Sequence, residues 1–399
     1  MDEGKRTKRN IWNDDDEDEL QQPKKRRALL GILGFFLILI VVLGVVLLAA
    51  YRDGTGFDVL RRYLHYGHAE EAGGESVYDY DADSGNQFAV LEKHLVVLSD
   101  TGLKILSPDE KTIWSTALNL KAPALDAGST MAVAYDVGGT VLYVVNAYGE
   151  VMRIEADSEE PIIAASLNEH VWLSITTEKR NYKGCVQVYD PEMELAFVFN
   201  SSSRFVMDAC VVGDGEKLAA VTLGQEDSTF VSNVVLYDLH ETEPYADYSI
   251  ENGLVLGIDA EEDRIVTVSD TCLTCANANG KIVSTHSYGR EHLREYHLAG
   301  DGFAVLLLSR YQSGSLGRLL SVGTDGTQLG SLDVKEEILD ISAAGRYLAV
   351  LYADRVVVYN PDLQVYASLT GIDQARGVLM RPDGSVLLLG AESAHLFLP

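Results

Sequence analysis

Cysteine is scarce in this sequence, and the few cysteines present do not form a metal or disulfide pattern. The 399 residues include four cysteines: Cys185, Cys210, Cys272 and Cys275. Cys272 and Cys275 form a C-x-x-C, but they lie in the strand-like run TCLTCANANG, where residues three apart point to opposite faces. A redox or zinc site would require a helix start or a second C-x-x-C. We therefore expect free thiols, buried or half-buried, and no disulfide framework.

Basic residues are also few. The chain has 32 Lys and Arg against 60 Asp and Glu, a net charge of −28. Residues 1–50 hold eight of each kind, so the remaining 24 basic and 52 acidic residues place the whole net charge after residue 50. Such a surface repels nucleic acid and anionic lipid headgroups. We expect no nucleic acid, and partners that are cationic, neutral or bound through an apolar patch, although a plain acidic coat for solubility is the simpler interpretation.

One long apolar run predicts a transmembrane helix over residues 28–50. ALLGILGFFLILIVVLGVVLLAA has 23 residues without a charge, and a helix of that length spans about 34 Å, enough for a bilayer core of about 30 Å. Four basic residues, 24–27, precede the run directly. The excess of positive charge on that side predicts a disordered cytoplasmic tail over residues 1–27 and an extracytoplasmic domain. Residues 51–75 then read as a short juxtamembrane helix (FDVLRRYLHY) and a flexible linker.

From residue 76 to residue 399 the pattern predicts an all-β fold. Short runs of Val, Ile, Leu, Tyr and Thr are separated by Gly, Asp, Asn and Pro every 7–12 residues. The clearest unit, over residues 338–371, has four such runs: ILDISAAG, RYLAVLYAD, RVVVYNPD and LQVYASLTG. Seven units of this kind follow one another, with an average period of about 41 residues, which lies within the range of WD-type blades. This predicts a β-propeller of eight four-stranded blades, with seven as the alternative.

The two ends of this region supply the strands of the eighth blade. GVLMRPDG, SVLLLGA and SAHLFL near the C-terminus provide three strands, and ESVYDYDA (75–82) provides one spare strand at the front. An N-terminal strand that completes a C-terminal blade closes the ring without an open edge. Between third and fourth strands, SPDEKT, YDPEME, GTDGTQ and YNPDLQ contain hairpin-turn residues. SPDEKTIW (107–114) nearly matches an Asp-box, which is a structural turn and does not imply sialidase activity.

Two groups of side chains are candidate cation sites. HSYGREHLREYH contains His286, Glu291, His292, Glu295 and His297, but its spacing is not the H-E-x-x-H of a zinc helix. Its place between two predicted blades favours solvated loop residues over a metal site.

The second group, Asp79, Asp81 and Asp83, alternates as in a calcium loop. Ser84 and Val90 stand where an EF-hand requires Gly and Glu, so that motif is not met. We assign no metal-binding residue.

Catalytic and cofactor signatures are missing as well. The sequence has no G-x-S-x-G elbow, and GDGEKLA lacks the spacing of a P-loop. Propellers that carry a quinone cofactor repeat a tryptophan docking motif in nearly every blade, whereas only Trp114 and Trp172 follow residue 50. We assign no catalytic or cofactor-binding residue and expect no cofactor.

Several segments resemble an uncharacterised, membrane-anchored β-propeller family of Gram-positive bacteria, a domain of unknown function in the WD-like and quinoprotein-like propeller superfamily. They are FDVLRRYLHYG (57–67), AYDVGGTVLYVVNAYGEV (134–151), PIIAASLNEHVWLSITTEKRNYKGCVQVYD (161–190) and RFVMDACVVGDGEKLAAVTLG (204–224). The resemblance implies architecture and location only, since the family has no assigned activity.

Two functions remain open at this point. The first is a membrane-tethered extracytoplasmic propeller that binds a protein or cell-envelope ligand, as a scaffold or sensor. The alternative is a cell-surface hydrolase or glycosidase-like enzyme with an active site in a central channel. A converging group of carboxylates, His or Arg at the centre would favour the enzyme. The lack of a catalytic signature favours binding.

Overall fold

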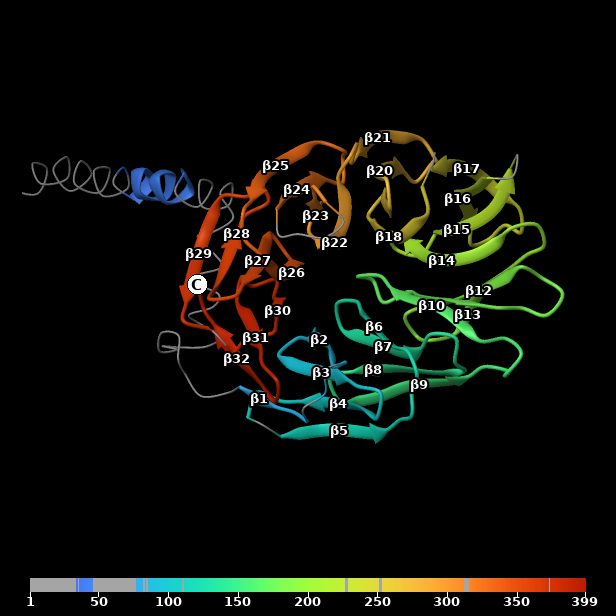
Figure 1. The fold of residues 1–399 in the computed structure, drawn as a ribbon, viewed down its shortest axis with the longest axis horizontal. Coiled ribbons are helices and arrows are strands. Elements are labelled where there is room, and N and C mark those ends of the chain that lie inside the picture. The colour runs from blue at the N-terminus through green and yellow to red at the C-terminus, as the bar shows by residue number, and fades with distance from the viewer. Residues whose placement is uncertain are drawn as a thin grey trace, which may run out of the picture. The chain divides into compact units, whose positions relative to one another are not determined.

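The computed structural model describes residues 34, 36–45, 77–81, 83, 85–109, 111–226, 229–250, 253–311, 316–372 and 374–399. The chain divides into two units, Met1–Gly67 and His68–Pro399. In the first, residues 36–45 are helical (Figure 1). Within these described ranges no helix has both the length and the apolar character that crossing a bilayer requires. The predicted tail (1–27), the predicted juxtamembrane segment and linker (51–75), and most of the predicted span (28–50) lie outside the described residues.

The second unit is an eight-bladed β-propeller. In its described residues, 32 strands form eight four-stranded antiparallel sheets, and the sheets are arranged around a central axis (Figure 1). The all-β prediction is confirmed, and eight blades are found rather than the alternative of seven.

The strands of blades 1 to 4 are as follows: β2 (Gln87–Leu91), β3 (His94–Leu98), β4 (Gly102–Leu106) and β5 (Thr112–Ala117); β6 (Pro123–Ala127), β7 (Met131–Asp136), β8 (Val141–Asn146) and β9 (Gly149–Glu155); β10 (Ile162–Leu167), β11 (Leu173–Thr177), β12 (Gly184–Tyr189) and β13 (Leu195–Ser201); β14 (Phe205–Val212), β15 (Lys217–Glu226), β16 (Thr229–Asp238) and β17 (Pro244–Ile250).

Blades 5 to 8 continue the pattern: β18 (Val255–Glu261), β19 (Arg264–Ser269), β20 (Cys272–Asn277) and β21 (Ile282–Ser287); β22 (His292–Gly300), β23 (Phe303–Ser309), β24 (Gly317–Gly323) and β25 (Gln328–Val334); β26 (Ile338–Ala344), β27 (Tyr347–Tyr352), β28 (Arg355–Tyr359) and β29 (Val365–Thr370); and β30 (Gly377–Met380), β31 (Val386–Leu389) and β32 (Ser393–Phe397), joined by β1 (Tyr78–Asp79).

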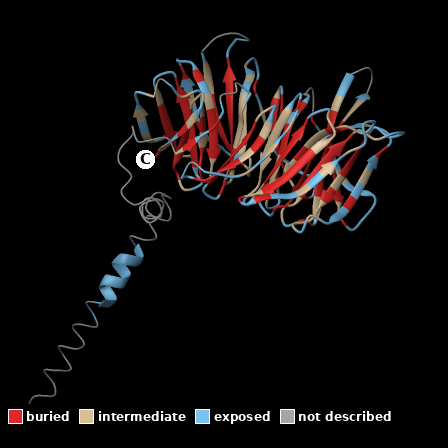
Figure 2. Cartoon of the chain, turned by 90° about the horizontal axis from the view of Figure 1, so that it is seen from below, coloured by how far each residue is buried: buried red, intermediate tan, exposed pale blue. Residues whose placement is uncertain are grey.

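The core lies between neighbouring blades, and the sequence of each strand reflects its distance from the axis. Second strands such as β3 (HLVVL) and β23 (FAVLLLS) are buried along their whole length, because both faces pack against other blades. Fourth strands such as β5 alternate between exposed and half-buried residues, as expected at the rim. Seen from the side, buried residues fill the strands and exposed residues gather in the turns (Figure 2).

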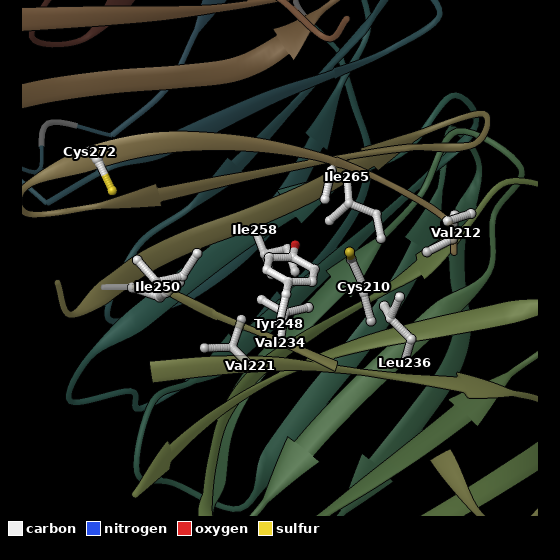
Figure 3. Packing of buried hydrophobic residues seen from close by; sticks show 14 residues of the cluster. Cys210, Val212, Val221, Val234, Leu236, Tyr248, Ile250, Ile258, Ile265 and Cys272 are labelled. Atoms are coloured by element: carbon white, nitrogen blue, oxygen red, sulfur yellow. The ribbon is translucent and has the colours of Figure 1, made fainter. Parts of the chain in front are cut away.

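The contact between blades 4 and 5 is typical of these interfaces. Cys210, Val234 and Tyr248 of blade 4 belong to one buried cluster with Ile258 and Ile265 of blade 5 (Figure 3). At about 25 cal/mol for each Å² of apolar surface removed from water, such clusters between blades are the main source of stability for the ring.

The ring is closed by its N-terminal strand. β1 pairs with β32 in the register Tyr78 to Ala394. Tyr78 is fully buried and its hydroxyl donates to the Lys93 carbonyl, while Arg381 Nη2 donates to the same hydroxyl at 2.9 Å. The predicted closure of the last blade by the front strand is therefore confirmed.

The turns between third and fourth strands have a common construction. The side-chain oxygens of Asn146, Asp190, Asn277 and Asn360 each accept from backbone N–H groups two to four residues further on. This confirms the hairpin-turn prediction.

The Asp-box-like segment is one of these turns. It joins β4 to β5, and the Ser107 N–H donates to the Lys111 carbonyl at 2.9 Å. The Ser107 hydroxyl bonds Asp109, so the segment has a structural role, as predicted.

The cysteines behave as expected. All four are free and buried. Cys272 belongs to the cluster between blades 4 and 5, and Cys275 to the cluster between blades 5 and 6. The two thiols therefore lie on opposite faces of β20, and the C-x-x-C is neither a redox pair nor half of a zinc site.

Candidate functional site

The two ends of the ring differ because all blades run in the same direction. The first strand of each blade begins at one end, which also carries the connections between blades and the turns between second and third strands. We call it the collar end. The opposite end carries the turns between first and second strands and those between third and fourth strands.

A β-bulge occurs at the same place in the first strands of blades 3 to 7, within the residues that the structure describes. In each of these strands, one extra residue interrupts the register with the second strand. The extra residues, which we call the collar, are Ile163, Met207, Leu256, Arg294 and Leu339. A bulge inserts an unpaired residue and re-aims its side chain.

The collar side chains reach solvent around the axis at the collar end. Met207 is 37% exposed, Leu256 47% and Leu339 43%. Both faces of a first strand pack against neighbouring blades and one edge is bonded to the second strand, so only the free edge, toward the axis, stays open (Figure 1). Arg294 is the one charged member, and its Nη2 donates to the Ile338 carbonyl at 3.3 Å.

The apolar surface extends beyond the collar. Of nineteen exposed large hydrophobic side chains in the described part of the propeller, ten lie at the collar end, while the other nine lie on the outer fourth strands or, for Tyr148, in the turn before one of them. The ten are Val137, Tyr182, Phe205, Met207, Phe230, Leu254, Leu256, Tyr311, Leu316 and Leu339. Phe230, 68% exposed, lies on the hairpin of β15 and β16, whose strands have ten residues each.

Five carboxyl groups lie on the first strands of blade 2 and of blades 4 to 7. This carboxyl ring consists of Asp126, Asp208, Asp259, Glu295 and Asp340, one each from β6, β14, β18, β22 and β26. All five are half-buried. Three of them come directly after a collar residue in the sequence.

Backbone N–H groups hold these carboxylates in place, often across a blade boundary. Asp126 accepts from the Leu167 N–H of blade 3 at 2.8 Å, and Asp340 accepts from the Val378 N–H of blade 8 at 2.8 Å. First strands of neighbouring blades do not pair, so the carboxylates satisfy backbone donors that face the axis.

Burial raises the pKa values of all five groups of the carboxyl ring. Burial, with smaller contributions from the charges of Asp126 and Asp259, raises the pKa of Asp208 to about 7. Burial likewise raises the pKa of Asp259 and of Glu295 to about 7, and it raises the pKa values of Asp126 and Asp340. Asp208, Asp259 and Glu295 therefore change charge near neutral pH instead of near pH 4.

Glu295 and Asp340 form a hydrogen-bonded pair. Burial, and then the charge of Asp340, raises the pKa of Glu295, so the protonated Glu295 donates to Asp340. Glu295 Oε1 also accepts from the Ile341 N–H at 3.2 Å. A glycosidase needs its two carboxyl groups about 5 Å or more apart, with the sugar between them. A directly bonded pair does not fit the glycosidase-like alternative.

The predicted cation candidates do not converge. Within the described ranges no three His, Cys, Asp or Glu side chains are placed to hold one metal ion. His286 Nε2 lies 2.8 Å from the Gly326 carbonyl, and Glu291 pairs with Arg318. The expectation of solvated loop residues is wrong for His286, which lies on β21, and for His292, Glu295 and His297, which lie on β22. Burial lowers the pKa of His297 to about 4.

The aspartates near the front strand are separated too. Asp79 lies on β1 opposite Ser393. Asp81 forms an exposed ion pair with Lys104, and Asp83 accepts from the Gly85 N–H at 2.9 Å. Asp81 and Asp83 therefore have different partners, and among the described residues the three carboxylates do not share one site.

A family is shown by comparison with known proteins. Residues 68–365 match the family of unknown function DUF5711. The chain belongs to this family. The predicted resemblance to a family of unknown function is confirmed; its membrane anchoring and Gram-positive origin stay predictions. No curated protein matches the chain.

Solved structures agree with the fold of this DUF5711 member. The C-terminal WD40 domain of Sif2 is 14% identical with a TM-score of 0.56, covering 83% of this chain and 100% of that one. BamB from Moraxella catarrhalis is 12% identical with a TM-score of 0.50, covering 81% and 98%. At these identities the likeness shows the propeller fold alone.

The carboxyl ring was missed in the sequence, although a signal is present in this DUF5711 member. An apolar residue, an aspartate and then Ala or Ile recur in the first strands of blades 2, 4, 5 and 7, as LDA (125–127), MDA (207–209), IDA (258–260) and LDI (339–341). Asp208 and Asp340 lie opposite the fifth residue of the second strand, whereas Asp126 and Asp259 lie opposite the third, so the recurrence of the triplet in first strands is the signal that groups them.

Proposed function

We propose that this protein is a membrane-anchored extracytoplasmic β-propeller that binds a protein or cell-envelope ligand and acts as a scaffold. The observation that carries the proposal is the group of exposed apolar side chains around the axis at the collar end. Within the described propeller, the exposed large hydrophobic residues of the first strands, Phe205, Met207, Leu256 and Leu339, all lie at the collar end, whereas those nearer the opposite end lie on the outer fourth strands and in the turn that contains Tyr148. Large apolar areas left open on a soluble fold are typical of interaction surfaces.

The anchor and its orientation are part of the same proposal. The uncharged run over residues 28–50 is long enough for a bilayer, and Lys24, Lys25, Arg26 and Arg27 precede it. This arrangement supports a cytoplasmic tail over residues 1–27, a linker over residues 51–75 and a propeller outside the membrane. The surface charge of −28 supports a ligand other than nucleic acid.

Binding is favoured over hydrolysis. The one close carboxyl pair, Glu295 and Asp340, bonds to itself and to backbone N–H groups in the described structure. Catalysis would need a carboxylate free to meet a substrate or a water. A propeller that presents the apolar collar on fixed strands fits a scaffold better.

Crosslinking in intact cells tests the proposal. The full chain and a chain ending at Gly56 are captured from solubilised membranes after crosslinking. Partners recovered only with the propeller support the scaffold. Equal recovery by both chains, or recovery by neither, contradicts it.

A topology experiment tests the orientation. The four native cysteines are replaced by serine and one cysteine replaces Gly73. Labelling of intact cells by a membrane-impermeant maleimide is expected. Labelling only after lysis would show that the propeller faces the cytoplasm.

A further inference from the structure

We propose that the collar end binds an extended segment of a partner protein that carries a lysine or arginine between apolar side chains. The basic group lies at the carboxyl ring and the apolar side chains lie on the collar. This inference rests on the proposed function, because it names the surface and the kind of partner.

The first argument is the adjacency of the two features. Asp208 follows Met207, Glu295 follows Arg294 and Asp340 follows Leu339. One residue of a strand advances by about 3.3 Å. A ligand that packs on the collar therefore brings its next polar group to the carboxyl ring.

The second argument is the lack of a cation among the carboxyls. The pKa values of Asp126, Asp208, Asp259 and Asp340 respond to burial, to hydrogen bonds and to other carboxylates. In this part of the described structure a basic side chain acts on Glu295 alone, and it is Arg294. A cation at the ring would relieve the repulsion between carboxylates and stabilise their charged forms.

The third argument is the choice of residues in the bulges. A bulge requires an extra residue but not an apolar one, as Arg294 shows in blade 6. Exposed Met207, Leu256 and Leu339 occupy the same place in blades 4, 5 and 7. Because the register of each strand holds its bulge, the collar is a preorganised surface, and binding to it requires little ordering.

The fourth argument concerns the size of the ligand. Among the described residues no three ligating side chains converge on one point, so a bare metal ion is not the occupant. The apolar surface also extends outward from the axis to Phe205 and Leu254, 52% and 44% exposed. A polypeptide with a basic residue and apolar neighbours matches both parts, and the acidic domain attracts it over a distance.

Photocrosslinking from a single position tests this inference in the full chain. Benzoylphenylalanine replaces Leu256 in one variant and Tyr148, 75% exposed at the opposite end, in the control. After irradiation of intact cells, the joined peptides are identified by mass spectrometry. The expected result is a crosslink from position 256 to a segment with Lys or Arg within a few residues of the joined site.

Carboxyl variants then test the charge contact. Asp208→Asn with Asp340→Asn should reduce the yield of the crosslink from position 256. The identified segment, made as a labelled peptide, should bind the full-length protein at least tenfold more weakly when norleucine replaces its basic residue.

The outcomes separate this inference from the proposed function. A crosslinked segment without a basic residue, or an affinity unchanged by the carboxyl variants, overturns the charge contact. Crosslinks from position 148 alone overturn the collar as the binding surface and leave the scaffold function standing. No crosslinked protein from either position, together with no partner for the full chain, overturns both.

Discussion

Replacing Asp208 with asparagine removes one of the carboxyl groups whose pKa is raised to about 7 by burial. Its side-chain oxygen accepts from the Ala209 N–H at 2.8 Å, and the asparagine oxygen keeps that acceptor. The substitution therefore changes the titration of the site more than its shape.

The sign and size of the effect follow from linkage. The pKa of Asp208 is about 7 in the folded protein against 3.8 when unperturbed. Below pH 3.8 both states are protonated and the contribution to stability is fully present. As pH rises toward 7, the unfolded chain ionises first, so the free energy of unfolding falls. Between pH 5 and pH 7 this one group lowers stability by about 2 kcal/mol, or about 3 °C in Tm for a domain of this size.

Thermal unfolding of the full chain in detergent at constant ionic strength measures this. The wild type should lose Tm from pH 5 to pH 7, and Asp208→Asn should lose about 3 °C less. The control is Asp333→Asn, at an exposed position on the outermost strand β25. Equal pH slopes for the wild type and Asp208→Asn would refute the reasoning, because Asp208 would then not keep its proton through this range.

Further predictions concern closure, packing and binding. Tyr78→Phe should lower the free energy of unfolding by about 1–3 kcal/mol in denaturant titrations, because the hydroxyl is buried and hydrogen-bonded. Gly215→Ala should cost more than about 2 kcal/mol, since its φ is +98° and a Cβ would lie 1.9 Å from Trp172; the control Gly138→Ala, with φ +76° and open space, should cost only about 1 kcal/mol. Arg294→Gln should strengthen binding of the basic segment several-fold in anisotropy titrations, because it removes the one positive charge of the collar. The same titrations should show tighter binding at pH 8 than at pH 6, since more of the carboxyl ring is then ionised.

The architecture could be predicted because each blade repeats local signals. Second strands such as β23 are continuous apolar runs, and Asp190 and Asn360 mark turns at equivalent places. Closure by the front strand could be predicted by counting strand-like runs. After seven four-strand units, three runs remained at the C-terminus and one at the front. These features depend on short-range patterns, which a single sequence contains.

The candidate site could not be predicted in the same way. A bulge shifts the alternation of inward and outward side chains by one residue. In the sequence, Met207 and Leu339 therefore look like interruptions of a strand and not like parts of an exposed surface. Asp126 acts on the pKa of Asp208, which lies in another blade, only because the ring arranges the blades around one axis. The segment from His286 to His297 looks like one cluster in the sequence, but the structure separates it. His286 lies on β21 and His297 on β22, so residues close in sequence belong to different blades.

The pairing of β1 with β32 also sets an order of events during biosynthesis. Tyr78 leaves the ribosome more than 300 residues before its partner Ala394. Until then β1 has no strand to pair with, and the apolar faces of the first and last blades have no neighbour. The ring of the nascent propeller therefore stays open, with apolar surface exposed to aggregation, until its final residues are synthesised. A chain truncated shortly before residue 393 would leave an incomplete ring exposed to proteases and chaperones, even with seven blades already made.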